Sequence, residues 1–120
     1  MTYQKQIGNE GESIAADFLR QNGFHLLEQN FTSRYGEIDL VAIQSNCVVF
    51  VEVKTRTTQT FGMPEDSITP VKLERVQNAG LMWLQEHPEA PGDWRIDVIA
   101  ILMDSKRHVQ DIKHFVNVQL

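Results

Sequence analysis

The sequence has 120 residues, of which 42% are hydrophobic, and its formal net charge is −5 from 11 basic and 16 acidic residues. This length suits a single domain over residues 1–120, and the apolar content excludes a disordered chain. The single cysteine, Cys47, excludes a disulfide framework and a thiolate metal cluster, and the acidic balance argues against a protein that coats nucleic acid through charge alone.

The N-terminal residues MTYQKQIGNEGES lack the apolar core that is typical of a signal peptide. No apolar run approaches the roughly 20 residues that a membrane span requires. We therefore expect a cytoplasmic protein with no membrane segment.

The first predicted element is a helix over residues 10–22, where apolar residues recur at helical spacing and Asn22-Gly23 is a stop signal. Residues 24–31 are predicted to form a strand. Residues 30–36 are polar and typical of a turn.

Two further strands, over residues 36–43 and 48–54, form a predicted hairpin around a turn at residues 44–47. Side chains alternate between the two faces of a strand. Glu37 and Asp39 therefore share a face with Val41 and Ile43, away from Ile38, Leu40 and Ala42. Glu52 and Lys54 share a face with Val48 and Phe50.

After a polar loop over residues 55–67, Thr69 is a plausible N-cap for a second helix that begins at Pro70 and ends at His87-Pro88. Ala79 and Gly80 would let this helix pack closely on a sheet. Strands over residues 94–102 and 109–116 complete the order α-β-β-β-α-β-β. This order predicts an α/β domain whose mixed central sheet is flanked by helices.

The hairpin places charged side chains inside its apolar runs. A loop of two or four residues gives the same register, in which Asp39 lies opposite Glu52 and Glu37 lies opposite Lys54. Two directly opposed carboxylates destabilise a strand pair. They are tolerated where they share a proton, pair with a cation or bind a metal ion.

This set of residues suits metal-assisted chemistry. Magnesium takes oxygen ligands, usually one or two carboxylates with waters, so Asp39, Glu52 and the backbone carbonyl of Val53 are candidate ligands. Lys54 lies on the same face as Glu52. There it could position or deprotonate a water, or stabilise charge on a phosphorus centre. Such a site suits phosphodiester hydrolysis.

Glu12 has two interpretations. It lies on the apolar stripe of the first helix, so its carboxylate would face the sheet and could join the metal site. Alternatively, Asn9 and Glu12 have the spacing of a capping box, with Asn9 as the N-cap.

Several stretches together carry a resemblance to a family: GNEGESIAADFLRQNGF (8–24), GEIDLVA (36–42), VFVEVKTR (49–56), FGMPEDSITPVK (61–72) and WRIDVIAI (94–101). The chain resembles the YraN-like family of bacterial endonuclease-related proteins. That resemblance implies a restriction-endonuclease-like fold with a PD-(D/E)xK site, similar to archaeal Holliday-junction resolvases.

Carried over by residue, the resemblance makes Asp39 the motif aspartate and makes Glu52 and Lys54 the E-x-K pair. Glu12 matches the helix glutamate of the resolvases, and Ile38 stands where the motif name has proline. The resemblance further implies Mg²⁺ or Mn²⁺ as cofactor and a homodimer.

For the remaining polar residues, an ordinary structural role stands as the alternative to a role in the site. Arg34, Arg56 and Lys72 are candidate phosphate contacts or plain surface charges. Glu37 is expected to pair with Lys54, and Asp97 is expected to form a structural pair with Arg95 or another base.

These residues predict a metal-dependent endonuclease that cuts DNA, branched DNA included. Two alternatives remain open at this point. The domain could bind nucleic acid through a remnant of the site without cutting it. It could instead be a protein-interaction module with a partner in DNA processing.

Overall fold

The computed structural model describes residues 2–58 and 62–119. Its elements are α1 (Tyr3–Gln21), β1 (His25–Ser33), β2 (Gly36–Gln44), β3 (Cys47–Thr57), the 3₁₀ helix η1 (Pro64–Ser67), α2 (Pro70–Glu86), β4 (Trp94–Met103) and β5 (Val109–Phe115). The predicted order of helices and strands is confirmed, with η1 as an addition.

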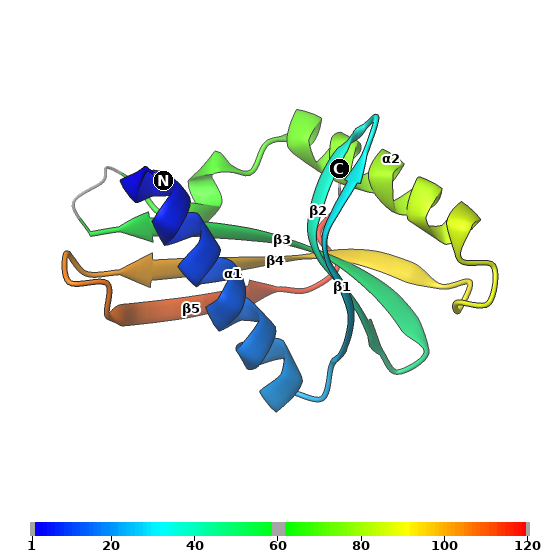
Figure 1. The fold of residues 1–120 in the computed structure, drawn as a ribbon, viewed down its shortest axis with the longest axis horizontal. Coiled ribbons are helices and arrows are strands. Elements are labelled where there is room, and N and C mark those ends of the chain that lie inside the picture. Colours follow the sequence, from blue (N-terminus) through cyan, green and yellow to red (C-terminus); the bar gives the residue numbers. More distant parts are fainter. Residues whose placement is uncertain (1, 59–61, 120) are drawn as a thin grey trace.

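The strands of the described residues form one five-stranded sheet in the order β1-β2-β3-β4-β5. Neighbouring strands are antiparallel except β3 and β4, which are parallel and joined through α2. Figure 1 shows α1 crossing the strands of this sheet. The mixed sheet and its order agree with the restriction-endonuclease-like fold that the resemblance implies.

The two helices cover opposite faces of the sheet, as alternate residues of β3 show. Val49 and Val51 belong to a buried cluster with α1, whereas Val48 and Phe50 belong to a second cluster with α2. Gly80 permits the close approach of α2, because a Cβ added there would lie 2.6 Å from a ring carbon of Phe50. The predicted close packing at this glycine is confirmed.

The β2–β3 hairpin turns on Ser45 and Asn46, whose φ angles of 50° and 61° are those of a two-residue type I′ turn. The predicted register is confirmed from the pair Gln44–Cys47 to the pair Leu40–Val51. There the ladder ends, while β2 stays paired with β1 and β3 stays paired with β4.

The two strands therefore open into a fork, and Figure 1 shows β1 and β2 bending away from β3 and β4. The predicted backbone pairings of Asp39 with Glu52 and of Glu37 with Lys54 do not form. Ile38 also departs from its predicted face, since it packs in the cluster of α2 and not with Leu40. The bend that opens the fork explains both differences.

Helix α1 begins at Tyr3, seven residues before its predicted start at residue 10. Its N-cap is Thr2, whose side chain accepts a hydrogen bond from the Lys5 amide at 3.1 Å. Buried Ile7, four residues before buried Gly11, extends the apolar stripe backwards and anchors the additional turns. The capping box at Asn9 is therefore wrong, and Glu12 lies midway along the helix.

The second helix is as predicted, with Thr69 as its N-cap and His87 as its C-cap. The loop predicted over residues 55–67 is partly wrong. Thr55 to Thr57 continue β3, because they pair with Ile101 to Met103 of β4. Residues 64–67 form η1, and residues 59–61 of that loop lie outside the described residues. Among the helices described, none is long and apolar enough to cross a membrane.

Candidate functional site

Asp39 is fixed at the point where β2 and β3 separate. Its Oδ2 accepts a hydrogen bond of 2.7 Å from the backbone N–H of Val53. Had the ladder continued, Ile38 would have lain opposite Val53, and its backbone carbonyl would have accepted a hydrogen bond from this N–H. The carboxylate of Asp39 therefore replaces a backbone partner, which both closes the ladder and holds the side chain in place.

The carbonyl of Val53 also faces the fork. The N–H and C=O groups of one strand residue point to the same side of the strand. Because the Val53 N–H points at Asp39, its carbonyl points into the same space. This orientation is compatible with the ligand role that the sequence predicts for the Val53 carbonyl.

Glu52 and Lys54 project from the same strand as an ion pair. The Lys54 Nζ lies 3.5 Å from Glu52 Oε1. The side chain of Lys54 is 27% exposed and that of Glu52 is 14% exposed. Glu37 is exposed, and the ion pair of Lys54 is with Glu52. The predicted pair of Glu37 with Lys54 is therefore wrong, since β2 and β3 no longer pair at this level, although the charge of Glu37 still acts on Asp39.

The fork disfavours ionised carboxylates. Burial raises the pKa of Asp39, although the hydrogen bond from Val53 and the charge of Lys54 oppose the rise. Burial and then the negative charge of Asp39 raise the pKa of Glu52 to about 7, against the opposing effects of Lys54 and Lys72. Asp39 and Glu52 are thus close enough to repel each other.

Glu12 joins these residues from α1. Burial, followed by the charges of Asp39 and Glu37, raises the pKa of Glu12 to about 7. Its carboxylate therefore shares the negative field of Asp39. We call the set formed by Glu12, Asp39, Glu52, Lys54 and the Val53 carbonyl the acidic fork.

The residues of the acidic fork fit a hard divalent cation. Within the described residues no three His, Cys, Asp or Glu side chains already converge as a metal centre. Mg²⁺ does not require such a cage, since it keeps several waters and takes one or two carboxylates. Asp39 and Glu52 could supply these, because they lie close enough to repel each other and a cation between them would relieve that repulsion.

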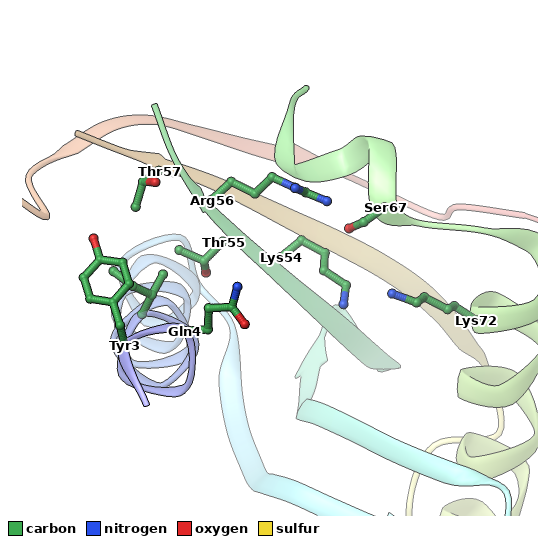
Figure 2. A pocket seen from close by; sticks show the side chains of 9 residues that line it. Tyr3, Gln4, Lys54, Thr55, Arg56, Thr57, Ser67 and Lys72 are labelled. Atoms are coloured by element: carbon green, nitrogen blue, oxygen red, sulfur yellow. The ribbon is translucent and has the colours of Figure 1, made fainter. Parts of the chain in front are cut away.

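A cavity of about 480 Å³ adjoins the acidic fork and shares Lys54 with it. It also brings together Arg56 and Lys72, two of the three predicted phosphate contacts (Figure 2). The third, Arg34, lies elsewhere, at the β1–β2 turn, with its guanidinium 4.9 Å from the ring centre of Tyr35. We call this cavity the cationic pocket.

Among the residues that line the cationic pocket, the sequence indicated only Lys54, Arg56 and Lys72, and Tyr3, Gln4 and Ser67 were missed among others. Tyr3 and Gln4 were missed because the helix was predicted to begin only at residue 10. The signal was present, since Thr2 is a good N-cap and Ile7 continues the stripe of Gly11 and Ala15 at helical spacing. Ser67 carries no comparable signal, because its position depends on how η1 packs.

Asp97 has a structural role, as predicted. It is fully buried, and its oxygens accept hydrogen bonds from Arg95 at 3.0 and 3.3 Å and from the Asn117 amide at 2.9 Å. His114 Nε2 lies 2.8 Å from the same carboxylate. Burial alone would raise the pKa of Asp97, but these hydrogen bonds outweigh it and hold the pKa below its usual value.

Comparisons with known proteins identify the family. The chain is 39% identical over 113 residues to a UPF0102 protein of Syntrophomonas wolfei, an alignment that covers 94% of this chain and 96% of that protein. It is 42% identical over 116 residues to a UPF0102 protein of Pelobacter propionicus, with coverage of 94% and 81%. The model of a family described as "Uncharacterised protein family UPF0102" matches residues 11–101. The chain therefore belongs to the UPF0102 family, which is the YraN-like family that its motifs indicated.

Proposed function

We propose that the protein is an enzyme that hydrolyses phosphodiester bonds of nucleic acid, with DNA as the first substrate to test, using Mg²⁺ or Mn²⁺ at the acidic fork. The observation that carries this proposal is the position of Asp39. The Val53 amide holds its carboxylate where the strands separate, beside Glu52. A purely structural carboxylate in such a place would be expected to have a cation of its own.

The proposed roles follow from the geometry. Asp39, Glu52 and the Val53 carbonyl would hold the metal ion, and Glu12 would add negative charge from α1. The bound ion would supply Lewis-acid activation of water and of the phosphate. Lys54, already oriented by Glu52, would donate a hydrogen bond to the attacking water or to a phosphate oxygen.

In the reaction, a water oxygen forms a bond to phosphorus, and the bond from phosphorus to the leaving sugar oxygen breaks. The attacking water loses a proton to solvent, and the leaving oxygen gains one. The cations of the neighbouring pocket support this reaction, because Arg56 and Lys72 can bind the phosphate backbone beside the fork.

The test is a cleavage assay on labelled single-stranded, duplex, flap and four-way-junction DNA with Mg²⁺, Mn²⁺ or EDTA. Asp39→Asn and Lys54→Ala proteins, purified identically, run beside the wild type, and Asp17→Asn on the exposed face of α1 is the matched control. We expect metal-dependent cutting by the wild type and the control and its loss in both site variants. Cutting that survives in Asp39→Asn, or no cutting of any substrate, would contradict the proposal.

A further inference from the structure

The cationic pocket gathers positively charged side chains, an arrangement that does not by itself stabilise the fold. Lys54, Arg56 and Lys72 line it, and within the described residues Arg56 and Lys72 form no ion pair with a carboxylate. Figure 2 shows the ammonium groups of Lys54 and Lys72 pointing toward each other, and the Arg56 guanidinium extending toward Ser67. Like charges gathered in this way repel one another, so the arrangement favours a bound anion.

The start of α2 adds to this positive field. Lys72 lies in the first turn of the helix, and that turn contains no acidic residue. A cation at a helix N-terminus opposes the helix dipole, whereas an anion is stabilised there. The nearby Lys54 ammonium, together with partial burial, lowers the pKa of Lys72, and the negative charge of Glu52 opposes this effect only in part.

The opposite end of the cationic pocket is aromatic and apolar. Tyr3, which is 48% exposed, and buried Ile7 line it from the first turns of α1. Figure 2 places Tyr3 at the far side from Lys72, with Gln4 between them. Tyrosine rings stack on nucleic-acid bases, and an amide can hydrogen-bond to a sugar or a base edge. The volume of about 480 Å³ lies within the range of roughly 300–1,000 Å³ that takes a small ligand.

We propose that the cationic pocket binds one unpaired nucleotide of the substrate, with its phosphate among Arg56, Lys72 and Ser67 and its base against Tyr3. This inference rests on the proposed function, and it narrows the substrate class to strands with an unpaired nucleotide next to the scissile bond. A base that is paired in a duplex cannot enter, because its partner strand would have to enter with it.

The experiment measures binding in EDTA, where no metal-dependent hydrolysis occurs. The ligands are thymidine 5′-monophosphate, thymidine 3′-monophosphate, thymidine and inorganic phosphate. Calorimetry measures the affinity of each ligand, and amide chemical shifts show where it binds. We expect one or both monophosphates to bind more tightly than thymidine or phosphate, with shifts at residues 3–7, 54–57 and 67–72. Whether the 5′- or the 3′-monophosphate binds more tightly indicates the direction in which the substrate strand enters the pocket.

Variants separate the two ends of the pocket. Arg56→Gln and Lys72→Gln should each weaken monophosphate binding about tenfold or more, because each removes a charge-assisted hydrogen bond. Tyr3→Ala should weaken it at least about fivefold and leave binding of inorganic phosphate unchanged. Arg20→Gln, an exposed cation at the other end of α1, is the matched control and should bind as the wild type does. If Arg56→Gln does not fold, Arg56→Lys keeps the charge and should retain most of the affinity.

A second comparison uses an eight-nucleotide single strand and the duplex of the same sequence, and we expect shifts at the cationic pocket with the single strand alone. Equal binding of thymidine and its monophosphates, shifts outside the pocket, or an equal loss in Arg20→Gln would overturn the inference. If the protein cuts DNA but shows none of these shifts, nucleotide binding in the cationic pocket is overturned and the hydrolytic function stands. Nucleotide binding in the pocket without cleavage of any substrate would overturn the hydrolytic function instead.

Discussion

The carboxylate of Asp39 takes the place of a backbone carbonyl as the hydrogen-bond partner of the Val53 amide, at 2.7 Å. The Asp39 side chain thus ends the β2–β3 ladder, and the hydrogen bond by which it does so also fixes its position. The same contact turns the Val53 carbonyl toward the opening. Positioning of the proposed metal ligands is therefore a consequence of how the sheet divides.

Asp39→Asn should preserve the fold and change the electrostatics. The amide oxygen of asparagine can still accept the Val53 hydrogen bond, so the stability should change little. Because the charge of Asp39 helps to raise the pKa values of Glu12 and Glu52, both should fall below about 7 in the variant. Carboxyl carbon shifts followed against pH measure this. Asp17→Asn should leave both values in place, and unchanged values in Asp39→Asn would contradict the coupling.

Glu52→Gln should stabilise the metal-free protein at alkaline pH. Burial and Asp39 raise the folded-state pKa of Glu52 from 4.5 to about 7. The folded state therefore holds its proton longer than the unfolded state, so a cost to stability is absent below pH 4.5, grows up to about pH 7 and is complete above it. Removal of the charge should gain up to about 3 kcal/mol at pH 8 and nothing near pH 4.5.

Urea unfolding in EDTA at the two pH values, with wild type and variant side by side, measures this difference. A variant that is less stable than the wild type at pH 8 would show that the ion pair with Lys54 outweighs the burial of the carboxylate.

Gly11→Ala should destabilise the protein by about 1–3 kcal/mol, because the added methyl group overlaps the hydroxyl of Thr55. Gly8→Ala in the same helix is the matched control, since nothing lies within 4 Å of its added Cβ, and it should stabilise by about 0.5–1 kcal/mol. Thermal unfolding compares the two. Adding Thr55→Ala to Gly11→Ala should recover part of the loss, and no recovery would mean that the contact between α1 and β3 is misplaced.

Asp97→Ala should cost about 3–5 kcal/mol of stability, because it leaves the partly buried Arg95 and His114 without the fully buried carboxylate that they share. The lowered pKa of Asp97 means that its contribution is complete above the unfolded value of about 3.9 and is lost as the pH falls through the folded value. Denaturant unfolding at pH 7 measures the loss. If the folded variant also lost metal binding, a structural role alone would be refuted.

The sequence was informative where local rules decide the structure. Alternation along the strands and the short turn at Ser45-Asn46 predict the register that forms from Gln44–Cys47 to Leu40–Val51, and Thr69 with Pro70 marks the start of α2. These features depend on neighbours in the chain, so they can be read without knowledge of the whole fold.

The fork itself could not be predicted from the hairpin alone. Beyond Leu40–Val51, β2 continues with β1 and β3 continues with β4, and no sequence pattern marks the point at which the two strands part. The extension of β3 to Thr57 was likewise not predicted, since its last residues are stabilised by pairing with β4, a strand distant in the sequence. The cationic pocket depends on α1, β3, η1 and α2 together, which explains why the contribution of Ser67 could not be predicted.

The most direct test of a metal site at the acidic fork is paramagnetic broadening of amide resonances by substoichiometric Mn²⁺. We predict that broadening centres on Asp39, Glu52 and Val53, is displaced by excess Mg²⁺ and disappears in Asp39→Asn. Broadening that centres instead on exposed carboxylates at the far end of α2, such as Glu86 and Glu89, or an unchanged pattern in Asp39→Asn, would contradict the proposed metal site.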